Sequence, residues 1–449
     1  MNEKLIEKIS KLDQQIYAEH QFDTRLFAEL TKAQRELGIL DKGRPFCPFL
    51  RPHFFARPLY EKIARAAASI NQALEQMTFA ALESEEILNE LDLTETEKRL
   101  ARIEPRYAGV SNSSRLDSFI YGEDFKFLEC NGESPAGITD QTQIEKVLEK
   151  IPVVKEFLAE NKHWRPKPHE KLLQALIVAY RDFGGAKAKP NIAIVDWRGV
   201  STETEFESLR QFFESEGHAT LIADPHDVEY DGRALHVGEF AIDIFYKRVI
   251  IYEFLEKFGE THPLIRAYRD GNVCMANSFR SKIPHKKASF AILSDEKYEK
   301  IFTAEQLEMI RQHIPWTRRV REEKTTYEKE TVDLLEFLRR ERERFLIKPN
   351  DDYGGKGVVL GWEVSQTDWE QALNESLQNS FVAQQRALVE KISFPMYSEK
   401  IIFENLLIDF DPFLFSGKVE GGLVRLSSAS IVNVARGGGE TAMIVLEDF

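Results

Sequence analysis

Residues 345–359 read Phe-Leu-Ile-Lys-Pro-Asn-Asp-Asp-Tyr-Gly-Gly-Lys-Gly-Val-Val. The apolar start predicts a short strand that carries Lys348 to the mouth of a glycine-rich loop. Glycines allow backbone N–H groups to turn inward as a nest for an anion. Asp351 and Asp352 offer oxygens to Mg²⁺. The stretch is typical of a polyphosphate site, and a glycine-rich surface hairpin is the alternative. The loop itself contains Gly354, Gly355, Lys356 and Gly357.

The loop matches neither common nucleotide signature. It contains no G-x-x-x-x-G-K-[ST] motif, and its glycines lack the G-x-G-x-x-G spacing. A second apolar run, 358–360, follows the loop, so we expect a strand there instead of a helix N-terminus that could hold the phosphate.

Composition predicts a soluble globular protein with two or three domains. The 449 residues are 43% hydrophobic and 30% charged, and the formal net charge is −14. This charge argues against a nucleic-acid-binding surface but not against a local basic pocket. The chain shows no signal-peptide or membrane-spanning run, and its three widely spaced cysteines favour a reducing compartment. We therefore expect a cytoplasmic location without nucleic-acid or membrane partners, and a homodimer is left open.

Changes of pattern along the chain predict an α/β (α+β) protein with four segments. Residues 1–100 carry apolar side chains at helical spacing and form an N-terminal helical region. Residues 101–150 contain a β-hairpin at 119–131 with a three-residue turn, followed by a polar loop. Residues 151–270 read as a small parallel α/β domain, and residues 271–449 as charged helices followed by β-rich sequence.

The third segment alternates strand and helix patterns, which predicts a parallel sheet. Ligands usually bind beyond the carboxyl ends of such strands, which points to Asp196, Arg198 and Ser201. The last strand carries Arg248 to its end, where the guanidinium either reaches substrate or is a rim charge. The expected elements are strands at 191–195, 219–224 and 242–246 and a helix at 202–216.

The predicted hairpin carries a second signal, Glu129-Cys130-Asn131. On a strand, residues i and i+2 point to the same face, so Glu129 and Asn131 present two hard oxygens side by side. Mg²⁺ prefers such oxygens, with substrate phosphates and water completing its shell.

These motifs together resemble those of the circularly permuted ATP-grasp ligases, which include eukaryotic-type glutathione synthetase and glutathionylspermidine synthase. In ordinary ATP-grasp enzymes the Glu-x-Asn metal pair follows the glycine-rich loop, whereas here it precedes the loop by about two hundred residues. The resemblance runs from about residue 100 to the C-terminus. Its motifs are Arg115-Leu116-Asp117, Glu129-Cys130-Asn131, the run from Lys348 to Gly357, the run from Gly421 to Arg425, and the run from Asn433 to Gly439.

The resemblance implies a role for each motif. Glu129, Asn131 and Asp352 would hold Mg²⁺. Arg115 and Arg425 would act as catalytic arginines that hold the substrate carboxylate and the transferred phosphoryl group, because guanidinium forks suit both anions. The residues implied for ATP are the catalytic Lys348, with Lys286, Gly354, Gly355, Lys356, Gly357 and the adenine-hinge residues Gln384 and Gln385. Those implied for the substrate, besides Arg115, are Asp117, Ser134 and Arg248.

Several positions keep structural alternatives. Arg115 could pair with Asp117 or Glu123, and Ser134 could cap its own loop. Ser427 stands where the eukaryotic-type glutathione synthetases have a lysine, and Gln385 stands where an acid is common. These two differences leave the substrate undetermined.

The function implied is that of an ATP- and Mg²⁺-dependent carboxylate–amine ligase that forms a peptide-type bond through an acyl phosphate, similar to glutathionylspermidine synthase. Its partners would be a small-molecule or peptide carboxylate and an amine acceptor. Two other classes stay open, a non-catalytic nucleotide-binding protein of ATP-grasp shape and a small-molecule kinase.

Overall fold

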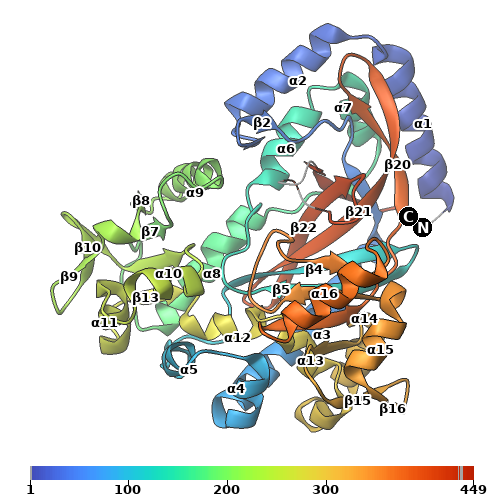
Figure 1. The fold of residues 1–449 in the computed structure, drawn as a ribbon. Coiled ribbons are helices and arrows are strands. Elements are labelled where there is room, and N and C mark those ends of the chain that lie inside the picture. The colour runs from blue at the N-terminus through green and yellow to red at the C-terminus, as the bar shows by residue number, and fades with distance from the viewer. Residues whose placement is uncertain (1–2, 433, 435–437) are drawn as a thin grey trace.

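A six-stranded antiparallel sheet lies at the centre of the molecule (Figure 1). The computed structural model describes residues 3–432, 434 and 438–449. The predicted hairpin is present at one edge of this sheet, with a two-residue turn, Gly122 and Glu123, in place of the expected three. The strand order is β23-β22-β21-β4-β5, and β20 pairs with β21. The strands are β4 (Ser113–Tyr121), β5 (Asp124–Asn131), β20 (Lys391–Tyr397), β21 (Ile401–Phe415), β22 (Lys418–Ser427) and β23 (Gly439–Thr441).

The two faces of this sheet differ in polarity. Leu116, Phe410 and Val424 lie on an apolar face that belongs to the largest hydrophobic core, and each has at least one charged neighbour along its strand. Because side chains alternate between the faces of a strand, the charged residues point to the opposite side. The sheet therefore has one face for packing and one face available for a polar site.

Helices from the first hundred residues pack in the same core as the sheet. The longest, α3 (Arg57–Glu83), begins with a proline in its first turn, where the missing N–H costs no hydrogen bond. The N-terminal helical region predicted from the sequence is thus present. Its other helices are α1 (Glu3–His20), α2 (Thr24–Glu36), α4 (Glu85–Leu91) and α5 (Glu95–Ala101). The short strands β1 (Leu40–Asp41) and β2 (Arg44–Pro45) lie between α2 and α3.

A small mixed sheet joins a strand from the first hundred residues to a strand near residue 445. In it β24 (Met443–Leu446) runs parallel to β3 (His53–Ala56) and antiparallel to β6 (His163–Trp164). The end of the chain also reaches α1, where Lys8 Nζ lies 5.3 Å from the ring centroid of Phe449. Three helices follow β5 along the chain: α6 (Asp140–Leu148), α7 (Pro152–Glu160) and α8 (Pro168–Asp182).

The predicted parallel sheet is confirmed as a separate lobe with the strand order β13-β12-β7-β8 (Figure 1). Its strands are β7 (Ile192–Val195), β8 (Thr220–Ala223), β12 (Ile244–Lys247) and β13 (Cys274–Ala276), and its helices are α9 (Glu203–Ser215), α10 (Ile251–Phe258) and α11 (Pro263–Asp270). A three-stranded antiparallel sheet of β9 (Glu229–Tyr230), β10 (Leu235–Val237) and β11 (Phe240–Ile242) extends this lobe.

The glycine-rich stretch lies in a four-stranded sheet of order β14-β19-β17-β18. The predicted strand that ends near Lys348 is β17 (Phe345–Pro349), and β18 (Val359–Leu360) returns antiparallel to it. The other strands are β14 (Thr317–Arg319) and β19 (Phe381–Gln385), with the hairpin β15 (Lys324–Tyr327) and β16 (Glu330–Asp333) beside them. The helices of this part are α12 (Lys282–His285), α13 (Ala288–Leu293), α14 (Ala304–His313), α15 (Leu334–Arg340) and α16 (Gln366–Ser376).

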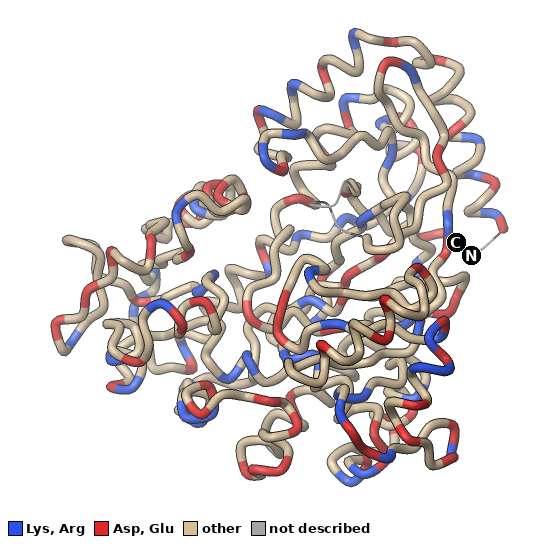
Figure 2. Tube along the Cα trace, in the orientation of Figure 1, with Lys and Arg blue, Asp and Glu red and all other residues tan. Residues whose placement is uncertain are grey.

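Acidic and basic residues are interleaved along the chain (Figure 2). None of the helices in the described part of the chain is both long and apolar enough to cross a membrane. Of the last sequence motif, 433–439, positions 433 and 435–437 lie outside the described residues.

We expect the apolar face of the central sheet to determine stability. Phe410 is fully buried, and its ring centroid lies 4.6 Å from that of Phe55. Phe410→Ala should lower the free energy of unfolding by about 3–5 kcal/mol, because it leaves a cavity in the core. Phe403→Ala on the same strand is the control, since Phe403 is 43% exposed. Equal losses for the two variants in urea denaturation would contradict this assignment.

Candidate functional site

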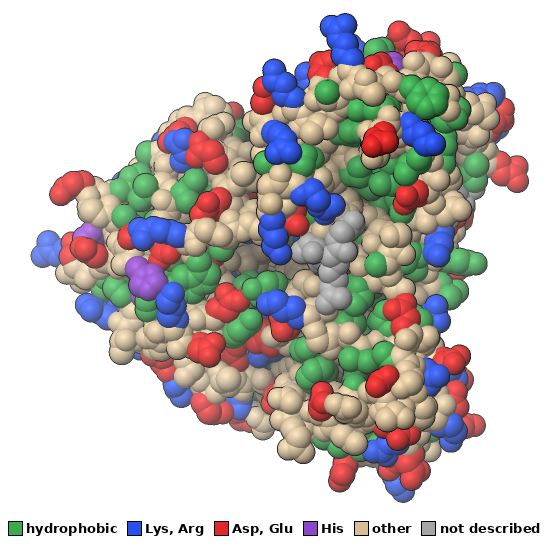
Figure 3. Space-filling view, turned by 45° about the horizontal axis from the view of Figure 1, so that its top comes forward, with side chains coloured by type: hydrophobic (Ala, Val, Ile, Leu, Met, Phe, Trp, Pro, Cys, Tyr) green, Lys and Arg blue, Asp and Glu red, His purple; other side chains and the backbone are tan. Residues whose placement is uncertain are grey.

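A cavity of about 890 Å³ lies between the charged face of the central sheet, the glycine-rich loop and the parallel-sheet lobe. Figure 3 shows the molecule hollowed at this place, with Lys and Arg side chains at the rim. The cavity brings together most of the residues predicted from the sequence. The predicted residues in its lining are Arg115, Asp117, Glu129, Asn131, Ser134, Lys348, Asp352, Gly354, Gly355, Lys356, Gln384 and Arg425.

The register of the central sheet explains why distant residues meet there. Arg115 is paired with Asn131 and Asp117 with Glu129 across the β4–β5 hairpin. Arg425 on β22 lies between Asp409 on β21 and Glu440 on β23. Residues paired across an antiparallel sheet have their Cα atoms about 4.5–5.5 Å apart. The pairings therefore bring two sets of charged side chains, one on β4 and β5 and one on β21 to β23, to the same sheet.

Arg425 forms the centre of a buried ionic network. Its Nη2 lies 3.0 Å from Asp117 Oδ2, 2.7 Å from Asp409 Oδ2 and 2.6 Å from Asp411 Oδ2. Burial alone would lower the pKa of Arg425, but these aspartates hold it well above its ordinary value. Burial raises the pKa of Asp409 to about 6 and that of Asp411 well above its usual range. The network therefore combines two guanidinium groups with carboxyl groups whose pKa values are raised by burial.

Arg115 forms the other half of this network. Its Nε and Nη2 donate to the two oxygens of Asp117 at 2.9 and 3.1 Å, and its Nη1 donates to the carbonyl of Ala136 at 3.0 Å. The pairing with Asp117 that the sequence left open is thus present. Both arginines also line the cavity, and none of the described residues accepts a hydrogen bond from Nη1 of Arg425.

The predicted metal pair lies on β5 beside two lysines. Glu129 Oε2 is 3.5 Å from Lys287 Nζ and 3.6 Å from Lys348 Nζ. Burial alone would raise the pKa of Glu129, but these ammonium groups lower it, so the side chain is a carboxylate at neutral pH. The amide nitrogen of Asn131 donates to Asp117 Oδ1 at 2.6 Å, which leaves its amide oxygen free for a cation. Carboxylate and amide oxygens are suitable ligands for Mg²⁺.

Lys348 and Lys287 bring positive charge to the part of the cavity next to Glu129. Lys348 Nζ donates to the carbonyl of Leu128 at 2.9 Å and to Gln384 Oε1 at 3.1 Å. Burial lowers the pKa of Lys348 to about 8, which leaves it largely protonated at pH 7. Lys287 Nζ donates to the backbone carbonyl of Asp352 at 2.6 Å, so it holds the start of the glycine-rich loop.

Lys286, predicted to contact ATP, lies elsewhere. Its Nζ is 2.6 Å from Asp351 Oδ2 and 3.4 Å from Glu97 Oε2, and it is outside the cavity lining. The neighbouring Lys287 takes the place that faces the cavity. The sequence reads His-Lys-Lys here, and the direction of each lysine depends on how the chain leaves α12 at His285.

Three other predicted residues are also outside the lining. Arg248 is 4% exposed, so it is not a rim charge, and its Nη1 donates to the carbonyl of Pro135 at 2.6 Å. It therefore positions the loop that carries Ser134. Gln385 donates to the hydroxyl of Tyr327 at 3.3 Å, on the side of β19 away from the cavity. Gly357 has a φ of +68°, and a Cβ there would lie 2.7 Å from the Pro349 ring. Gly357 therefore allows the loop to turn close to Pro349 and does not itself line the cavity.

Of the residues expected at the carboxyl ends of the parallel strands, one reaches the cavity. Ser201 is in the lining, whereas Arg198 pairs with Asp227 at 2.6 Å and points to solvent. Asp196 accepts from the N–H of Trp197 at 2.8 Å and is also outside the lining.

The sequence reading missed six carboxyl groups of the cavity lining, namely Asp41, Glu363 and the following four. Asp409 alternates with the buried Asp411 on β21, a spacing that could have marked a polar strand face. The other three come from separate elements, so only the fold brings them together. They are Asp140 on α6, Glu205 on α9 and Glu440 on β23.

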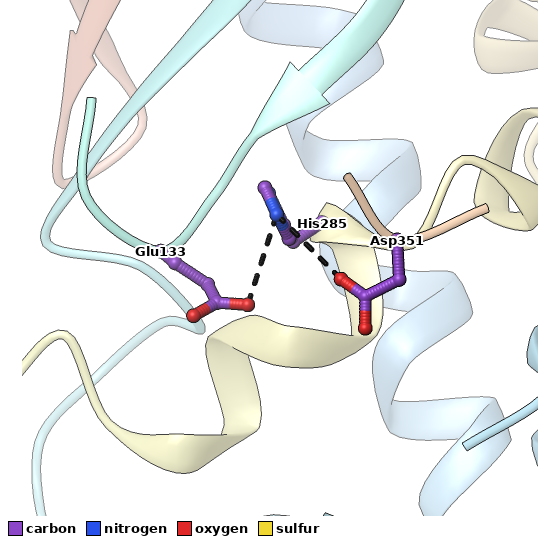
Figure 4. A group of neighbouring side chains, drawn as sticks. All are labelled: Glu133, His285 and Asp351. Carbon is purple, nitrogen blue, oxygen red and sulfur yellow. Dashed lines mark ion pairs between the residues drawn. The ribbon is translucent and has the colours of Figure 1, made fainter. Parts of the chain in front are cut away.

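Next to the cavity lies a group of three metal-type ligands, Glu133, His285 and Asp351 (Figure 4). The ammonium of Lys282 lies among them, 2.9 Å from Glu133 Oε1 and 2.5 Å from Asp351 Oδ1. Burial lowers the pKa of His285 to about 4, so the imidazole is neutral at pH 7. Lys282 therefore supplies the charge that a metal ion would bring.

Removing Lys282 should destabilise the fold, because the carboxylates of Glu133 and Asp351 then lose the ammonium group that accompanies them. Burial alone would raise the pKa of Glu133, but Lys282, His285 and Lys247 together lower it to about 2. This lowered pKa contributes stability above the unfolded pKa, and the contribution is lost as pH falls toward 2. Lys282→Met should lower the free energy of unfolding by about 3–5 kcal/mol at pH 7.

The deficit of Lys282→Met should shrink as pH falls below 5, because the uncompensated carboxyls then become protonated. Urea denaturation at several pH values measures this difference. Lys11→Met is the control, because Lys11 pairs with Glu7 at 2.7 Å and both side chains are exposed. A deficit that does not vary with pH would contradict the ionic assignment.

No protein-family model and no curated protein match the chain. Among solved structures, the apo form of a glutathione synthetase-like effector from Globodera pallida is similar over 95% of this chain and 97% of that chain, with a TM-score of 0.62 and 13% identity. A putative gamma-glutamylcysteine synthetase from Methylobacillus flagellatus covers 88% of this chain and 89% of its own, with a TM-score of 0.44 and 12% identity, too distant to support an argument. The chain therefore shares the overall fold of a glutathione synthetase-like protein.

Proposed function

We propose that this chain is an ATP- and Mg²⁺-dependent carboxylate–amine ligase that acts through an acyl phosphate, on a circularly permuted ATP-grasp framework. One observation carries the proposal: a single cavity brings Lys348, the glycine-rich loop, the Glu129–Asn131 pair and two arginines together from four separate segments. The shared fold with a glutathione synthetase-like effector supports a reaction of the synthetase type.

The cavity has the features that ATP requires. Leu128, Leu346 and Leu360 provide an apolar wall for a nucleobase next to Lys348. Gly354 and Gly355 have φ values of +67° and +71°, which is compatible with N–H groups turned inward around phosphates. The sequence implied that Gln384 contacts adenine, but its side chain is already hydrogen-bonded to Lys348, Leu128 and Thr317. Backbone groups of β19 are therefore the expected partners of adenine.

Each part of the cavity would contribute to phosphoryl transfer. Mg²⁺ at Glu129, Asn131 and Asp352 would neutralise the phosphates. Lys348 and Lys287 would orient the phosphate chain. Arg425 and Arg115 would hold the carboxylate so that its oxygen attacks the γ-phosphorus and ADP leaves. An amine would then attack the acyl carbon and release phosphate. The glycine-rich loop would exclude water, which otherwise hydrolyses the acyl phosphate.

The loop has a contact that would support such closure. Tyr353 at its tip donates from its hydroxyl to Glu253 Oε1 of α10 at 2.9 Å, so the loop reaches the parallel-sheet lobe. Closure over ATP and the position of that lobe are therefore linked.

A screen for ADP release tests the proposal directly. Purified protein with Mg²⁺-ATP is mixed with amino acids and short peptides as carboxylates, each with and without amine acceptors. We expect ADP and phosphate to appear together with an amide for a productive pair. A phosphorylated product without amide would support the kinase alternative, and the absence of ADP with every pair would count against both enzymes.

The proposed metal pair gives a sharper test with the productive pair. Glu129→Gln removes a charged Mg²⁺ ligand from the site and should lower kcat by a factor on the order of 10²–10³, the range seen when one electrostatic group is removed from an active site. The fold should be retained, as judged by circular dichroism. Glu123→Gln in the turn of the same hairpin is the matched control, because Glu123 is exposed. Unchanged ADP release by Glu129→Gln would overturn the metal assignment.

A further inference from the structure

The cavity lining carries carboxyl groups that the proposed phosphoryl transfer does not use. Asp140 begins α6, Glu205 lies on α9, and Glu440 lies on β23 next to Arg425. Glu205 is 6% exposed and Glu440 is 7% exposed, yet both line the cavity. Three elements far apart in sequence thus direct acids to one place.

Two of these carboxyl groups have an oxygen that no group satisfies. Oε2 of Glu205 and Oε2 of Glu440 are buried and have no hydrogen-bond partner among the described residues. Oε1 of Glu205 accepts from the N–H of Ile138 at 2.7 Å, and its Oε2 is 3.7 Å from the Arg248 guanidinium, beyond hydrogen-bond distance. Since an unsatisfied buried carboxylate oxygen costs free energy, its retention at a cavity wall points to a ligand that donates hydrogen bonds.

Asp140 and Glu440 are hydrogen-bonded to each other. Two carboxyl groups can do this only when a proton lies between them, because ionised carboxylates are acceptors alone. A pair that shares one such proton carries a single negative charge and can accept a second proton. Glu440 is also the partner of Arg425 across β22 and β23, so the pair lies one strand from the arginine proposed to hold the substrate carboxylate.

We propose that Asp140 and Glu440 together accept the proton of the amine that attacks the activated carboxylate, and that this amine enters the cavity as its ammonium form. The inference rests on the proposed function. Glu205 provides a further acceptor for the ammonium. The site thereby favours a protonated amine over water or an alcohol, which bring no positive charge.

The step balances in protons and charge. The nitrogen arrives with three protons and gives one to the carboxyl pair, which becomes neutral. The freed lone pair forms the N–C bond with the acyl carbon, and the bond from that carbon to the phosphate oxygen breaks. The phosphate leaves with the electron pair and takes a second proton from the nitrogen, as HPO₄²⁻. The products are an amide, HPO₄²⁻ and the protonated pair.

Charged groups on the surrounding elements support this role. Burial and Glu205 raise the pKa of Asp140 to about 7, and the bond to Glu440 lowers it in part. Burial and Asp140 raise the pKa of Glu440 well above its usual range, while Arg425 and Arg115 act against this rise. Proton acceptance becomes easier as pH rises through 7, so amide formation should increase over that range. A general base works best when its pKa lies near the operating pH.

Two nucleophiles distinguish proton acceptance from structural support. The productive carboxylate and amine come from the ADP-release screen, and hydroxylamine, which is uncharged at pH 7, serves as the probe. Asp140→Asn and Glu440→Gln should lower kcat with the protonated amine by a factor on the order of 10²–10⁴. Hydroxamate formation from hydroxylamine should stay nearly unchanged, and the rise of rate with pH should disappear.

The controls distinguish a failure of the proton-acceptor role from a failure of the ligase proposal. Glu149→Gln, at the far end of α6, should leave both rates unchanged. Equal losses with the amine and with hydroxylamine, or no loss with the amine, would overturn the role of the pair while the ligase proposal stands. If wild-type protein forms neither amide nor hydroxamate, the proposed function fails, and this inference fails with it. Two isosteric variants are used because one of them could fail to fold.

Discussion

A fully buried ammonium group, that of Lys282, connects the parts of the molecule that surround the cavity. A buried positive charge is tolerated only when carboxylates accompany it. Its partners come from the loop after β5 through Glu133 and from the start of the glycine-rich loop through Asp351. Lys247, at the end of β12, is 3.8 Å from the same Glu133. The position of the glycine-rich loop and that of the parallel-sheet lobe therefore depend on one set of charges.

The cavity lining carries charges of both signs. Lys348 and Lys287 lie beside Glu129, and Asp140, Glu205 and Glu440 are carboxyl groups that the proposed phosphoryl transfer does not use. Arg425 is paired with aspartates on β4 and β21. Such a lining suits a reaction that brings a polyanion and a cation to one carbon atom. In the proposed ligase both sets of charges are needed, because the first activates an acid and the second takes a proton from an amine.

The sequence predicted the parts of this arrangement that depend on local geometry. Alternation along a strand places Glu129 beside Asn131, and the short apolar run of β17 ends at Lys348. The rest needed tertiary information. Lys286 and Lys287 are adjacent, and the turn that follows α12 decides which one faces the cavity. Arg248 follows its strand as predicted, but the loop 134–137 covers it. Glu440 enters the site only through the pairing of β22 with β23.

The parallel pairing of β3 with β24 has a consequence for how the chain is made. Phe54 and Phe55 on β3 are 1% and 2% exposed, and their strand neighbour is the segment Met443–Leu446. A ribosome synthesises β3 long before β24, so the aromatic edge of the early strand stays unpaired until β24 has followed it. Unpaired edges of this kind are templates for association with other chains. Stable folding of β3 therefore depends on a segment that is synthesised much later.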